Sequence, residues 1–472
     1  MNRWHGRTAR VFAAAVVASV VAGCSSGSGS SASSASSTGG ASSAGGATSA
    51  AAAASGGAAS GAAATSGGGA ATTGAKSGPV VNLSFWNGLT GPDKPAIDHI
   101  ISTFNATHPT IHVTSDPIPW DVLYTKLLPA FGAGKGPDLV GISSDNLPGY
   151  ASKHVLQPLD TIFSLANINK ANIVPSALDA GMYQGKLYGV PVESTPVMLY
   201  YNKTMFKTAG IANPPANWTE LAADAKKLTL PGGTGGNPKQ YGMAIGTNNT
   251  VELFPIFLWE ANGGILSADG KQVLLNNAGS QQAVEYWANL IKTDHISRPG
   301  LTGADADKLI TSGTAAMEVN GPWATSGYKA AKIDYGLAPV PTGPNGQHVS
   351  VGVTTVLGVS AAAKADKLKA AAEFYAYWTQ AANQSALSLM SGFPPVTKDV
   401  PASALASNPD VGAFAAQAGT TRALAPGQTN FASIQNDVFD PTIEQIVSDP
   451  TKAKSLLDQA ASKVQSMINT SG

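Results

Sequence analysis

Hydrophobic and polar positions follow a strand–helix alternation wherever the chain is rich in large side chains. Apolar residues alternate with polar ones over 81–85, which is typical of a half-buried strand, and then recur at helical spacing over 97–104. The same reasoning predicts a strand over 111–114, a helix over 123–128 and a strand over 139–142. Because strands that alternate with helices pair in parallel, this order predicts an α/β sheet.

Three more amphipathic helices are predicted later in the chain from apolar residues at helical spacing. These residues are Leu221/Ala225/Leu228, Val284/Trp287/Ile291 and Leu457/Ala460/Val464/Met467. Such stripes face a core, so Trp287 is expected to be buried, as is Trp378 on another amphipathic helix. The region is too long for a single hydrophobic core, and two α/β lobes are therefore predicted.

The first 24 residues have the features of a secretory signal that ends in a lipid-attachment site. Three arginines precede an apolar run over 11–22, which is shorter than the roughly 20 residues that span a bilayer. The run ends in Val21-Ala22-Gly23-Cys24, which resembles the bacterial lipobox, and Cys24 is the only cysteine. We expect lipidation at Cys24 and anchoring on the extracytoplasmic face of the cell membrane. The alternative is that this cysteine is incidental.

Residues 25–78 have the composition of a disordered linker. They contain only Ser, Gly, Ala and Thr apart from Lys76, so no large apolar side chain offsets the entropy of ordering. A flexible coil of this length has an end-to-end distance of roughly 40 Å, which would hold a globular body away from the membrane. The alternative, a disordered partner-binding tail, would need aromatic or charged anchors that the segment lacks.

The charge balance and the cysteine count exclude several classes of protein. The chain has 29 basic and 29 acidic residues, and a formal net charge of zero gives no electrostatic footprint for nucleic acid. One cysteine excludes a disulfide scaffold and a multi-cysteine metal site. His108 and His112 are four residues apart, but Pro109 and the strand pattern prevent them from sharing a helix face. No metal site and no cofactor is predicted.

Catalytic motifs are absent or incomplete in the sequence. No His-Glu-x-x-His, Walker A or dinucleotide-binding glycine pattern occurs. Ser144-Asp145-Asn146 and Ser326-Gly327-Tyr328-Lys329 match two β-lactamase elements, but in the wrong order and without Lys-Thr-Gly. The chain is therefore not expected to be an enzyme. The alternative, a secreted carbohydrate hydrolase, would need carboxylate chemistry that residue spacing does not reveal.

Seven short motifs share their order and approximate spacing with one protein family. They are Gly136-Pro137-Asp138-Leu139-Val140, Pro148-Gly149-Tyr150-Ala151, Gly185-Lys186-Leu187-Tyr188-Gly189-Val190-Pro191, Tyr200-Tyr201-Asn202-Lys203, Pro214-Pro215-x-x-Trp218-x-Glu220-Leu221, Gly313-Thr314-Ala315-Ala316-Met317 and Asn320-Gly321-Pro322-Trp323. Together they resemble the carbohydrate-binding family (family 1) of extracellular solute-binding lipoproteins that serve ABC importers. The resemblance extends from about Val81 over nearly the whole body.

The resemblance implies a periplasmic-binding-protein-like (type II) α/β fold, in which two lobes joined by hinge crossovers close on a ligand. The lobes would be 79–192 plus about 352–388, and 193–351 plus about 389–472. It also implies a monomer that hands an unchanged solute to an ABC permease and its ATPase.

A sugar site needs carboxylates or amides for the hydroxyls and aromatic platforms for the ring faces. Asp145 follows a predicted buried strand, where α/β sheets place ligands, and it aligns with a hydroxyl-binding aspartate of maltodextrin-binding relatives. Glu193 resembles the cleft glutamate of these relatives, and Ser194 is the other residue that can be aligned with that glutamate. The alternatives are a turn aspartate at 145 and a surface ion-pair partner at 193.

Aromatic candidates come from three separate segments. Trp323 resembles the ring-stacking tryptophan of the family, and Trp120 resembles an aromatic cleft position of glycerol-3-phosphate-binding relatives. Trp86 and Asn87 end the first predicted strand and would face the same cleft by analogy. Core packing is the alternative for Trp323 and Trp86.

Two residues of the second half resemble the glycerol-3-phosphate branch of the family. There an arginine like Arg422 reaches the ligand, and a glycine like Gly352 gives a backbone contact. Arginine suits phosphate through its bidentate fork and can also bind sugar hydroxyls, while a surface residue is the alternative. The sequence departs from maltodextrin binders at Leu89, Ile142 and Asn146, which argues against that specificity.

Two ligand hypotheses follow for an importer's binding protein. The first is a sugar, most simply a di- or oligosaccharide, supported by the tryptophans and carboxylates. The second is glycerol 3-phosphate or a glycerophosphodiester, supported by Arg422.

Overall fold

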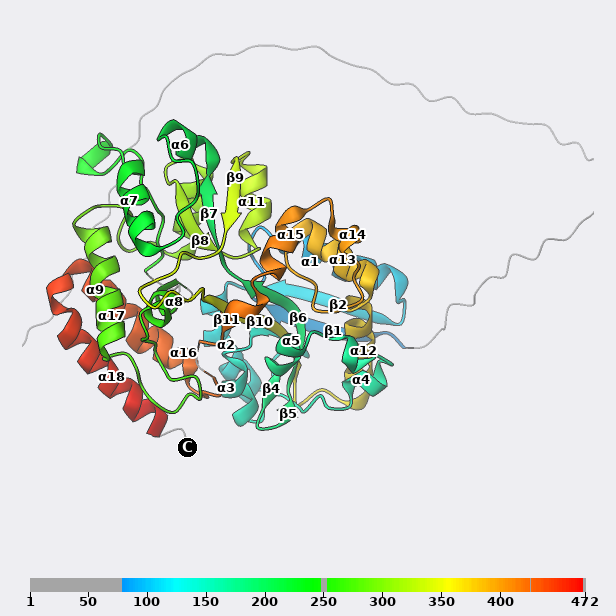
Figure 1. The fold of residues 1–472 in the computed structure, drawn as a ribbon. Coiled ribbons are helices and arrows are strands. Elements are labelled where there is room, and N and C mark those ends of the chain that lie inside the picture. Colours follow the sequence, from blue (N-terminus) through cyan, green and yellow to red (C-terminus); the bar gives the residue numbers. More distant parts are fainter. Residues whose placement is uncertain (1–78, 248–252, 425, 470–472) are drawn as a thin grey trace, which may run out of the picture. The chain divides into compact units, whose positions relative to one another are not determined.

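A computed structural model of the 472-residue chain describes residues 79–247, 253–424 and 426–469 (Figure 1). These residues all belong to one compact unit, Thr73–Gly472. The predicted signal peptide, Cys24 and the linker lie outside the described residues. Within the described ranges, no helix has both the length and the apolar character needed to cross a membrane.

The larger sheet is formed by β1 (Val81–Asn87), β2 (Ile111–Pro117), β3 (Leu139–Ser143), β6 (Gly189–Pro196), β10 (Ser350–Val359) and β11 (Thr421–Arg422). Its order is β11-β10-β3-β1-β2, and β6 also pairs with β10. β1 pairs in parallel with β2 and β3, whereas β10 runs antiparallel to β3 and β6. The predicted parallel α/β start of the chain is confirmed. We call the part of the molecule built on this sheet the first lobe.

The smaller sheet consists of β7 (Met198–Asn202), β8 (Met317–Asn320) and β9 (Tyr335–Ala338). β7 lies in the centre and pairs antiparallel with both neighbours. A separate hairpin pairs β4 (Met182–Tyr183) with β5 (Lys186–Leu187). We call the part built on the three-stranded sheet the second lobe.

Helices accompany both sheets (Figure 1). The first lobe contains α1 (Lys94–Thr107), α2 (Trp120–Gly132), α3 (Leu147–Ser152), α4 (Ile162–Leu165), α5 (Pro175–Asp179), α12 (Ala365–Trp378) and α13 (Ala381–Ser391). The second lobe contains α6 (Lys203–Thr208), α7 (Trp218–Leu228), α8 (Leu253–Glu260), α9 (Ala278–Lys292), α10 (Gly303–Thr311), α11 (Ala324–Ala330), α15 (Pro409–Ala415), α16 (Phe431–Ser433), α17 (Asp440–Ser448) and α18 (Ala453–Asn469). α14 (Ala402–Leu405) lies between α13 and α15 in the chain.

Local sequence signals fix where several of these helices begin. The side-chain oxygens of Asn202, Asn217, Asn277 and Thr302 accept hydrogen bonds from first-turn backbone N–H groups of α6, α7, α9 and α10. The predicted helices over 221–228, 284–291 and 457–467 lie within α7, α9 and α18. The amphipathic pattern thus located the helices, and the capping residues set their starts.

Two chain segments cross between the lobes side by side. β6 ends one residue before Val197 and β7 begins one residue after it, while β10 begins at Ser350. The Ser350 Oγ accepts a hydrogen bond from the Val197 N–H at 2.9 Å and donates one to the Val197 carbonyl at 3.0 Å. The chain therefore changes sheet close to the predicted lobe limits at 192/193 and 351/352, and the limits themselves stay a prediction.

Buried aromatic side chains fill both lobes. In the second lobe, Trp287 is completely buried and stacks on Phe257, with ring centroids 3.8 Å apart. In the first lobe, Trp378 is buried and its Nε1 donates to the Val192 carbonyl at 3.0 Å. The prediction that both tryptophans belong to the core is confirmed.

Replacing Trp287 by alanine should strongly destabilise the protein. Trp287→Ala removes the stacked ring and leaves a cavity, so we expect a loss of about 3–5 kcal/mol in the free energy of unfolding, measured by urea denaturation. Met390→Ala is the control, because Met390 is 44% exposed and should change stability by less than about 0.5 kcal/mol. Equal losses in the two variants would contradict the proposed packing role.

Candidate functional site

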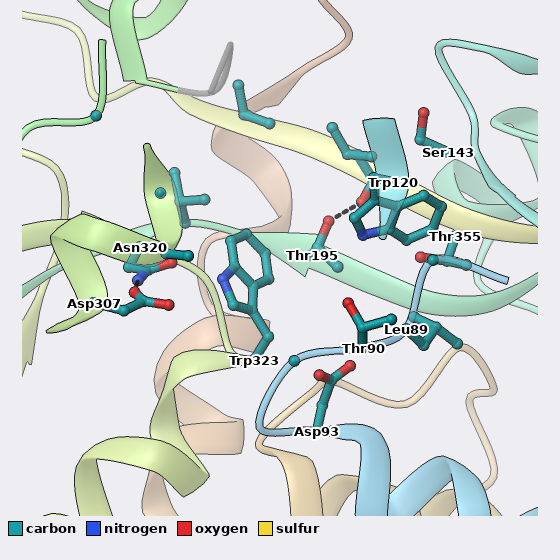
Figure 2. A pocket seen from close by; sticks show the side chains of 18 of the residues that line it. Leu89, Thr90, Asp93, Trp120, Ser143, Thr195, Asp307, Asn320, Trp323 and Thr355 are labelled. Carbon is teal, nitrogen blue, oxygen red and sulfur yellow. Dashed lines mark hydrogen bonds between the residues drawn. The ribbon is translucent and has the colours of Figure 1, made fainter. Parts of the chain in front are cut away.

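A cavity of about 570 Å³ is lined by residues from both lobes (Figure 2). The first lobe contributes the loop over 88–93, the start of α2, the turn after β3, and alternate residues of β6 and β10. The second lobe contributes α10, β8 and the turn before α11, together with Leu424, Phe431 and Gln435. Cavities of about 300–1,000 Å³ hold small organic ligands, so this one is large enough for a sugar-sized molecule.

Asp145 lies in the turn that follows β3, as the sequence predicts. It is buried and lines the cavity, and its Oδ1 accepts a hydrogen bond from the Leu424 N–H at 3.2 Å. Burial raises the pKa of neighbouring Tyr124 to about 12, and the negative charge of Asp145 contributes to the rise. The Asp145 carboxylate therefore joins the first lobe to the C-terminal part of the chain at the cavity wall.

Two tryptophans face the cavity from opposite lobes. Trp120 is the first residue of α2 and stacks on Tyr124, with ring centroids 5.7 Å apart, and Trp323 immediately precedes α11. Each indole lies directly over a glycine. A Cβ at Gly88 would be 2.0 Å from the Trp120 ring, and one at Gly321 would be 1.9 Å from the Trp323 ring. Both glycines are therefore required for the indoles to occupy these positions.

An asparagine orders the turn before each of these two glycines. The Asn87 Oδ1 accepts a hydrogen bond from the Leu89 N–H at 3.1 Å, and its Nδ2 donates to the Ser115 Oγ at 3.0 Å. The Asn320 Oδ1 accepts one from the Gly321 N–H at 2.8 Å. The same dipeptide, Asn-Gly, thus supports an aromatic platform in each lobe.

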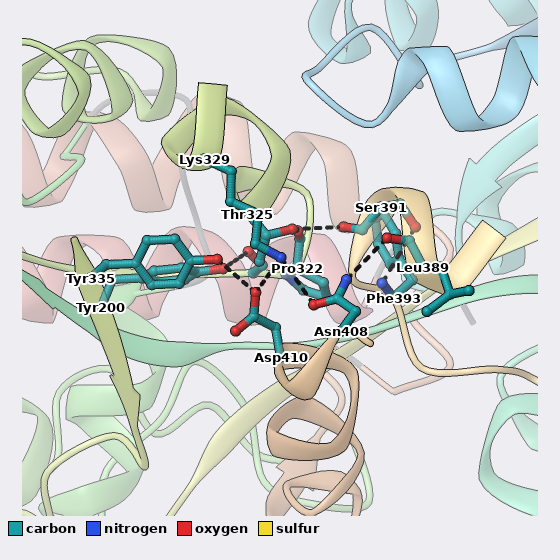
Figure 3. A network of polar contacts seen from close by, with 11 residues as sticks. Tyr200, Pro322, Thr325, Lys329, Tyr335, Leu389, Ser391, Phe393, Asn408 and Asp410 are labelled. Carbon is teal, nitrogen blue, oxygen red and sulfur yellow. Dashed lines mark hydrogen bonds and ion pairs between the residues drawn. The ribbon is translucent and has the colours of Figure 1, made fainter. Parts of the chain in front are cut away.

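The helix that follows Trp323 is held by a network of polar contacts (Figure 3). The Thr325 Oγ1 donates to the Ser391 carbonyl at 2.9 Å, and the Lys329 Nζ forms an ion pair with Asp410 at 2.7 Å. These contacts tie α11 to the end of α13 and to α15. The position of Trp323 therefore depends on residues about 70–90 positions later in the chain.

A buried carboxyl pair, Asp93 and Glu193, lines the first-lobe side of the cavity. Glu193 on β6 is 1% exposed, and neither of its carboxylate oxygens has a hydrogen-bond partner among the described residues. Burial, reinforced by the negative charge of Asp93, raises the pKa of Glu193 well above its usual value, and the nearby Thr355 hydroxyl offsets this only in part. Burial also raises the pKa of Asp93 to about 6, against the opposing effect of the first backbone N–H groups of α1.

A second buried carboxyl pair, Asp307 and Glu318, lines the second-lobe side. The Tyr328 hydroxyl donates to Glu318, and the Asn320 Nδ2 donates to the Asp307 Oδ1 at 2.6 Å and to the Tyr328 hydroxyl at 3.1 Å. Burial raises the pKa of both carboxyl groups. These two acids accept well-formed hydrogen bonds within the protein, whereas Glu193 has only the Thr355 hydroxyl nearby.

The described lining of the cavity carries acidic side chains and no basic one. Its ionisable carboxyl groups are Asp93, Asp121, Asp145, Glu193, Asp307 and Glu318. No lysine, arginine or histidine belongs to the described lining. Among the described residues, no group of three or more His, Cys, Asp or Glu side chains is arranged to hold a metal ion.

Four of the nine residues predicted to bind ligand line the cavity: Asp145, Glu193, Trp120 and Trp323. Ser194 and Gly352 do not belong to the described lining: Ser194 points to the opposite face of β6 from Glu193 and Thr195, and Gly352 lies against Thr421. The strand residues that do line the cavity alternate along each strand. They are Glu193, Thr195 and Val197 on β6 and its extension, and Val351, Val353 and Thr355 on β10.

The remaining predicted residues lie elsewhere in the described structure. Trp86 packs in a first-lobe hydrophobic cluster, and Asn87 supports the loop that carries the lining residues. Arg422 is exposed; its Nη2 donates to the Gln347 Oε1 at 2.9 Å, and its guanidinium lies 5.9 Å from the Trp259 ring. The structure therefore does not bring Arg422 to the cavity wall.

The sequence reasoning did not find Asp93, Asp307, Glu318 or Thr355 as lining residues. Glu318 lies two residues before Asn320 in the motif that ends in Trp323, and this proximity was the one available signal. Asp93 immediately precedes α1, where an acidic residue is ordinary, and Asp307 lies in the middle of α10, so neither stands out in the sequence. Only the folded structure brings them to one cavity.

Comparison with known proteins gives one family and several relatives. The family described as bacterial extracellular solute-binding protein matches residues 99–413 of this chain. A Brucella abortus (strain 2308) protein, named only as a binding protein, is 31% identical over 267 residues, which are 55% of this chain and 63% of that protein. The maltodextrin-binding protein MdxE of Bacillus subtilis (strain 168) is 28% identical over 225 residues, 46% of this chain and 50% of its own length.

The matched region thus spans less than two thirds of the length of these curated relatives. Among solved structures, UgpB from Mycobacterium tuberculosis in complex with glycerophosphocholine superposes with a TM-score of 0.74 at 21% identity, covering 84% of this chain and 99% of that one. At 21% sequence identity, this structural similarity establishes the fold of the chain and not its ligand. The predicted two-lobe α/β architecture is confirmed.

The Asp93–Glu193 pair should make the ligand-free protein less stable as the pH rises. A carboxyl group whose pKa is raised by folding keeps its proton up to a higher pH in the folded state than in the unfolded state. The free energy of unfolding is therefore largest at low pH and decreases as the pH rises from 3.8, the usual pKa of an aspartate, through about 6, the pKa of Asp93. We expect the free energy of unfolding to fall by about 1.4 kcal/mol per pH unit for each proton so retained.

Urea denaturation of the Asp93→Asn/Glu193→Gln double variant between pH 4 and pH 7 should give a flatter profile than wild type. Asp121→Asn, which removes an exposed carboxylate from the same cavity, should keep the wild-type slope. A double variant with the full wild-type slope would show that the pair does not titrate as described.

Proposed function

Because the chain belongs to the bacterial extracellular solute-binding protein family, we propose that it is the solute-binding lipoprotein of an ABC importer, which captures a sugar in the cavity between its lobes and delivers it to the permease. The observation that carries the proposal is the cavity itself, with Trp120 and Trp323 facing it from opposite lobes. The solute is a di- or oligosaccharide that is released unchanged, and the protein catalyses no reaction.

The lining chemistry matches what a sugar offers to a protein. Indole rings pack against the C–H faces of a pyranose, and carboxylates accept hydrogen bonds from its hydroxyls. Charge-assisted hydrogen bonds to sugar hydroxyls contribute about 1.5–3 kcal/mol each once water is excluded. Asp145 and Glu193, with the Asp307–Glu318 pair opposite, supply such acceptors on several sides of the cavity.

Ligand binding is coupled to lobe closure in this proposal. The lobes meet beside the cavity: the Ser326 Oγ donates to the Pro92 carbonyl at 2.7 Å, and Asp145 contacts the Leu424 N–H. A solute that touches both lobes favours this arrangement over an open one by its extra contacts, with the crossings at Val197 and Ser350 as the hinge. The permease recognises the closed form.

The ligand alternatives differ in charge, and the lining favours the sugar. A glycerophosphodiester or glycerol 3-phosphate carries an anionic phosphate, which needs a cationic or donor-rich partner. Arg422 was the residue that supported such a ligand, and it lies outside the described lining. The described lining offers an anionic phosphate no basic side chain, and those of its six carboxyl groups that are ionised would repel the phosphate.

The cellular setting rests on the N-terminal sequence. Cys24 and the preceding apolar run support lipid anchoring on the extracytoplasmic face of the cell membrane, and residues 25–78 support a tether. The protein works as a monomer, with the permease and its ATPase as partners.

Removal of the second-lobe platform should weaken sugar binding. We expect Trp323→Ala to raise the Kd at least tenfold for maltose, or for another sugar that the wild-type protein binds. This change corresponds to about 1.4 kcal/mol and is measured by isothermal calorimetry. Trp86→Ala is the matched control, because Trp86 packs outside the described lining and its loss should leave the Kd within threefold. An unchanged Kd in Trp323→Ala would remove this residue from the site.

Arg422 distinguishes the two ligand classes. Arg422→Ala should leave the Kd for a sugar within twofold, because its guanidinium contacts Gln347 and Trp259 rather than the cavity. Tryptophan fluorescence titrations with sugars and with glycerophosphocholine provide the measurement. Tight binding of glycerophosphocholine that is lost in Arg422→Ala would refute the sugar assignment.

A further inference from the structure

We propose that the buried Asp93–Glu193 pair recognises a protonated amine, so that the preferred solute is an amino saccharide rather than a purely neutral sugar. The inference rests on the proposed function, because it concerns the ligand of the same cavity. It refines the chemical class of the solute and leaves the capture mechanism unchanged.

Glu193 is buried at the cavity wall with unfilled hydrogen-bonding capacity. Its side chain lies on the cavity-facing side of β6, it is 1% exposed, and both of its oxygens lack a hydrogen-bond partner among the described residues. A buried carboxyl group without a donor destabilises the protein, and more so when it is charged. Apart from the nearby Thr355 hydroxyl, the described residues give Glu193 no hydrogen-bond donor, so a solute in the cavity would supply the missing one.

The Asp93–Glu193 pair has no basic side chain beside it in the described lining. Asp93, also buried, adds a second acid at the same wall, and its negative charge acts on Glu193. The nearest lysine in sequence, Lys94, is ion-paired with Asp98 on the outer side of α1. When these two buried acids are ionised, no basic side chain of the described lining balances their negative charge, and a cationic ligand group would do so.

The contrast with the second-lobe pair supports placing the amine at Asp93–Glu193. Glu318 and Asp307 receive hydrogen bonds from Tyr328 and Asn320, so their acceptor capacity is partly used within the protein. In Figure 2, Trp323 is drawn between Asp307 and Asp93, and its ring would offer a cation–π contact to an ammonium group in the cavity.

An ammonium group suits this pair better than a hydroxyl. It presents three donors and no acceptor, whereas ionised carboxylates are acceptors only. A hydroxyl supplies one donor and no charge, so it leaves the pair short of donors. The other titratable groups that line the cavity are Asp121, Tyr124, Asp145, Asp307 and Glu318, and none of them carries positive charge.

The test compares matched sugars that differ in one substituent. The probes are glucose and maltose, the analogues in which one hydroxyl at a time is replaced by a primary amine, and the N-acetylated forms of those amines. Calorimetry with the wild-type protein at pH 7.5 and low salt should show at least one amine binding tenfold or more tightly than both its hydroxyl parent and its neutral N-acetyl form.

Two variants and a control locate the preference. Glu193→Gln and Asp93→Asn keep the shape of the pair and remove charge, so each should reduce the amine preference to less than threefold. Asp116→Asn removes an exposed carboxylate outside the described lining and should retain the preference. Melting temperatures establish that the variants are folded.

Proton linkage gives an independent readout on the wild-type protein. Calorimetry in two buffers of different ionisation enthalpy should show protons released when the amine binds, because a cation favours the ionised pair, and none released with the hydroxyl parent. The amine preference should also grow as the pH is raised from 5 to 7.5.

The outcomes separate this inference from the proposed function. If the parent sugars bind and no amine analogue binds more tightly, the inference is wrong and the sugar-binding function stands. A preference that survives unchanged in both variants would also overturn it. If no sugar or amino sugar binds the folded protein, both the function and the inference fail.

Discussion

One pair of hydrogen bonds fixes the point about which the two lobes are arranged. The Ser350 hydroxyl accepts from the Val197 N–H and donates to the Val197 carbonyl, which joins the two crossing segments where the chain passes between sheets. The strands on either side then fix which residues reach the cavity. Glu193 and Thr195 face it before the crossing on β6, and alternate residues of β10 face it after Ser350. The first-lobe wall of the cavity is a consequence of this register.

The aromatic walls depend on a second constraint, the close approach of an indole to a backbone. Trp120 and Trp323 occupy space that a Cβ at Gly88 or Gly321 would fill. The preceding asparagines hold the two turns through side-chain hydrogen bonds. Asn87 therefore supports the cavity without contributing to the described lining, and a short polar turn in each lobe holds one of the two indoles at the cavity.

The charged side chains of the described cavity lining are all acidic. Six acidic residues line it and no described lining residue is basic, although the whole chain has no formal net charge. The acids of the second lobe accept hydrogen bonds from Tyr328 and Asn320, whereas Glu193 has only the Thr355 hydroxyl nearby. An overall charge count conceals this asymmetry, because it does not show that the basic residues are absent from the described lining.

The sequence by itself determined the alternation of strands and helices, the burial of Trp287 and Trp378, and four of the lining residues, because periodicity and motif order are local properties of the chain. Tertiary structure alone decided that Ser194 and Gly352 face away, since strand register sets side-chain direction. It also placed Arg422 beside Gln347 and Trp259. The convergence of Asp93 with Glu193, and of Asp307 with Glu318, likewise followed from folding, because pairs that are distant in sequence leave no local pattern.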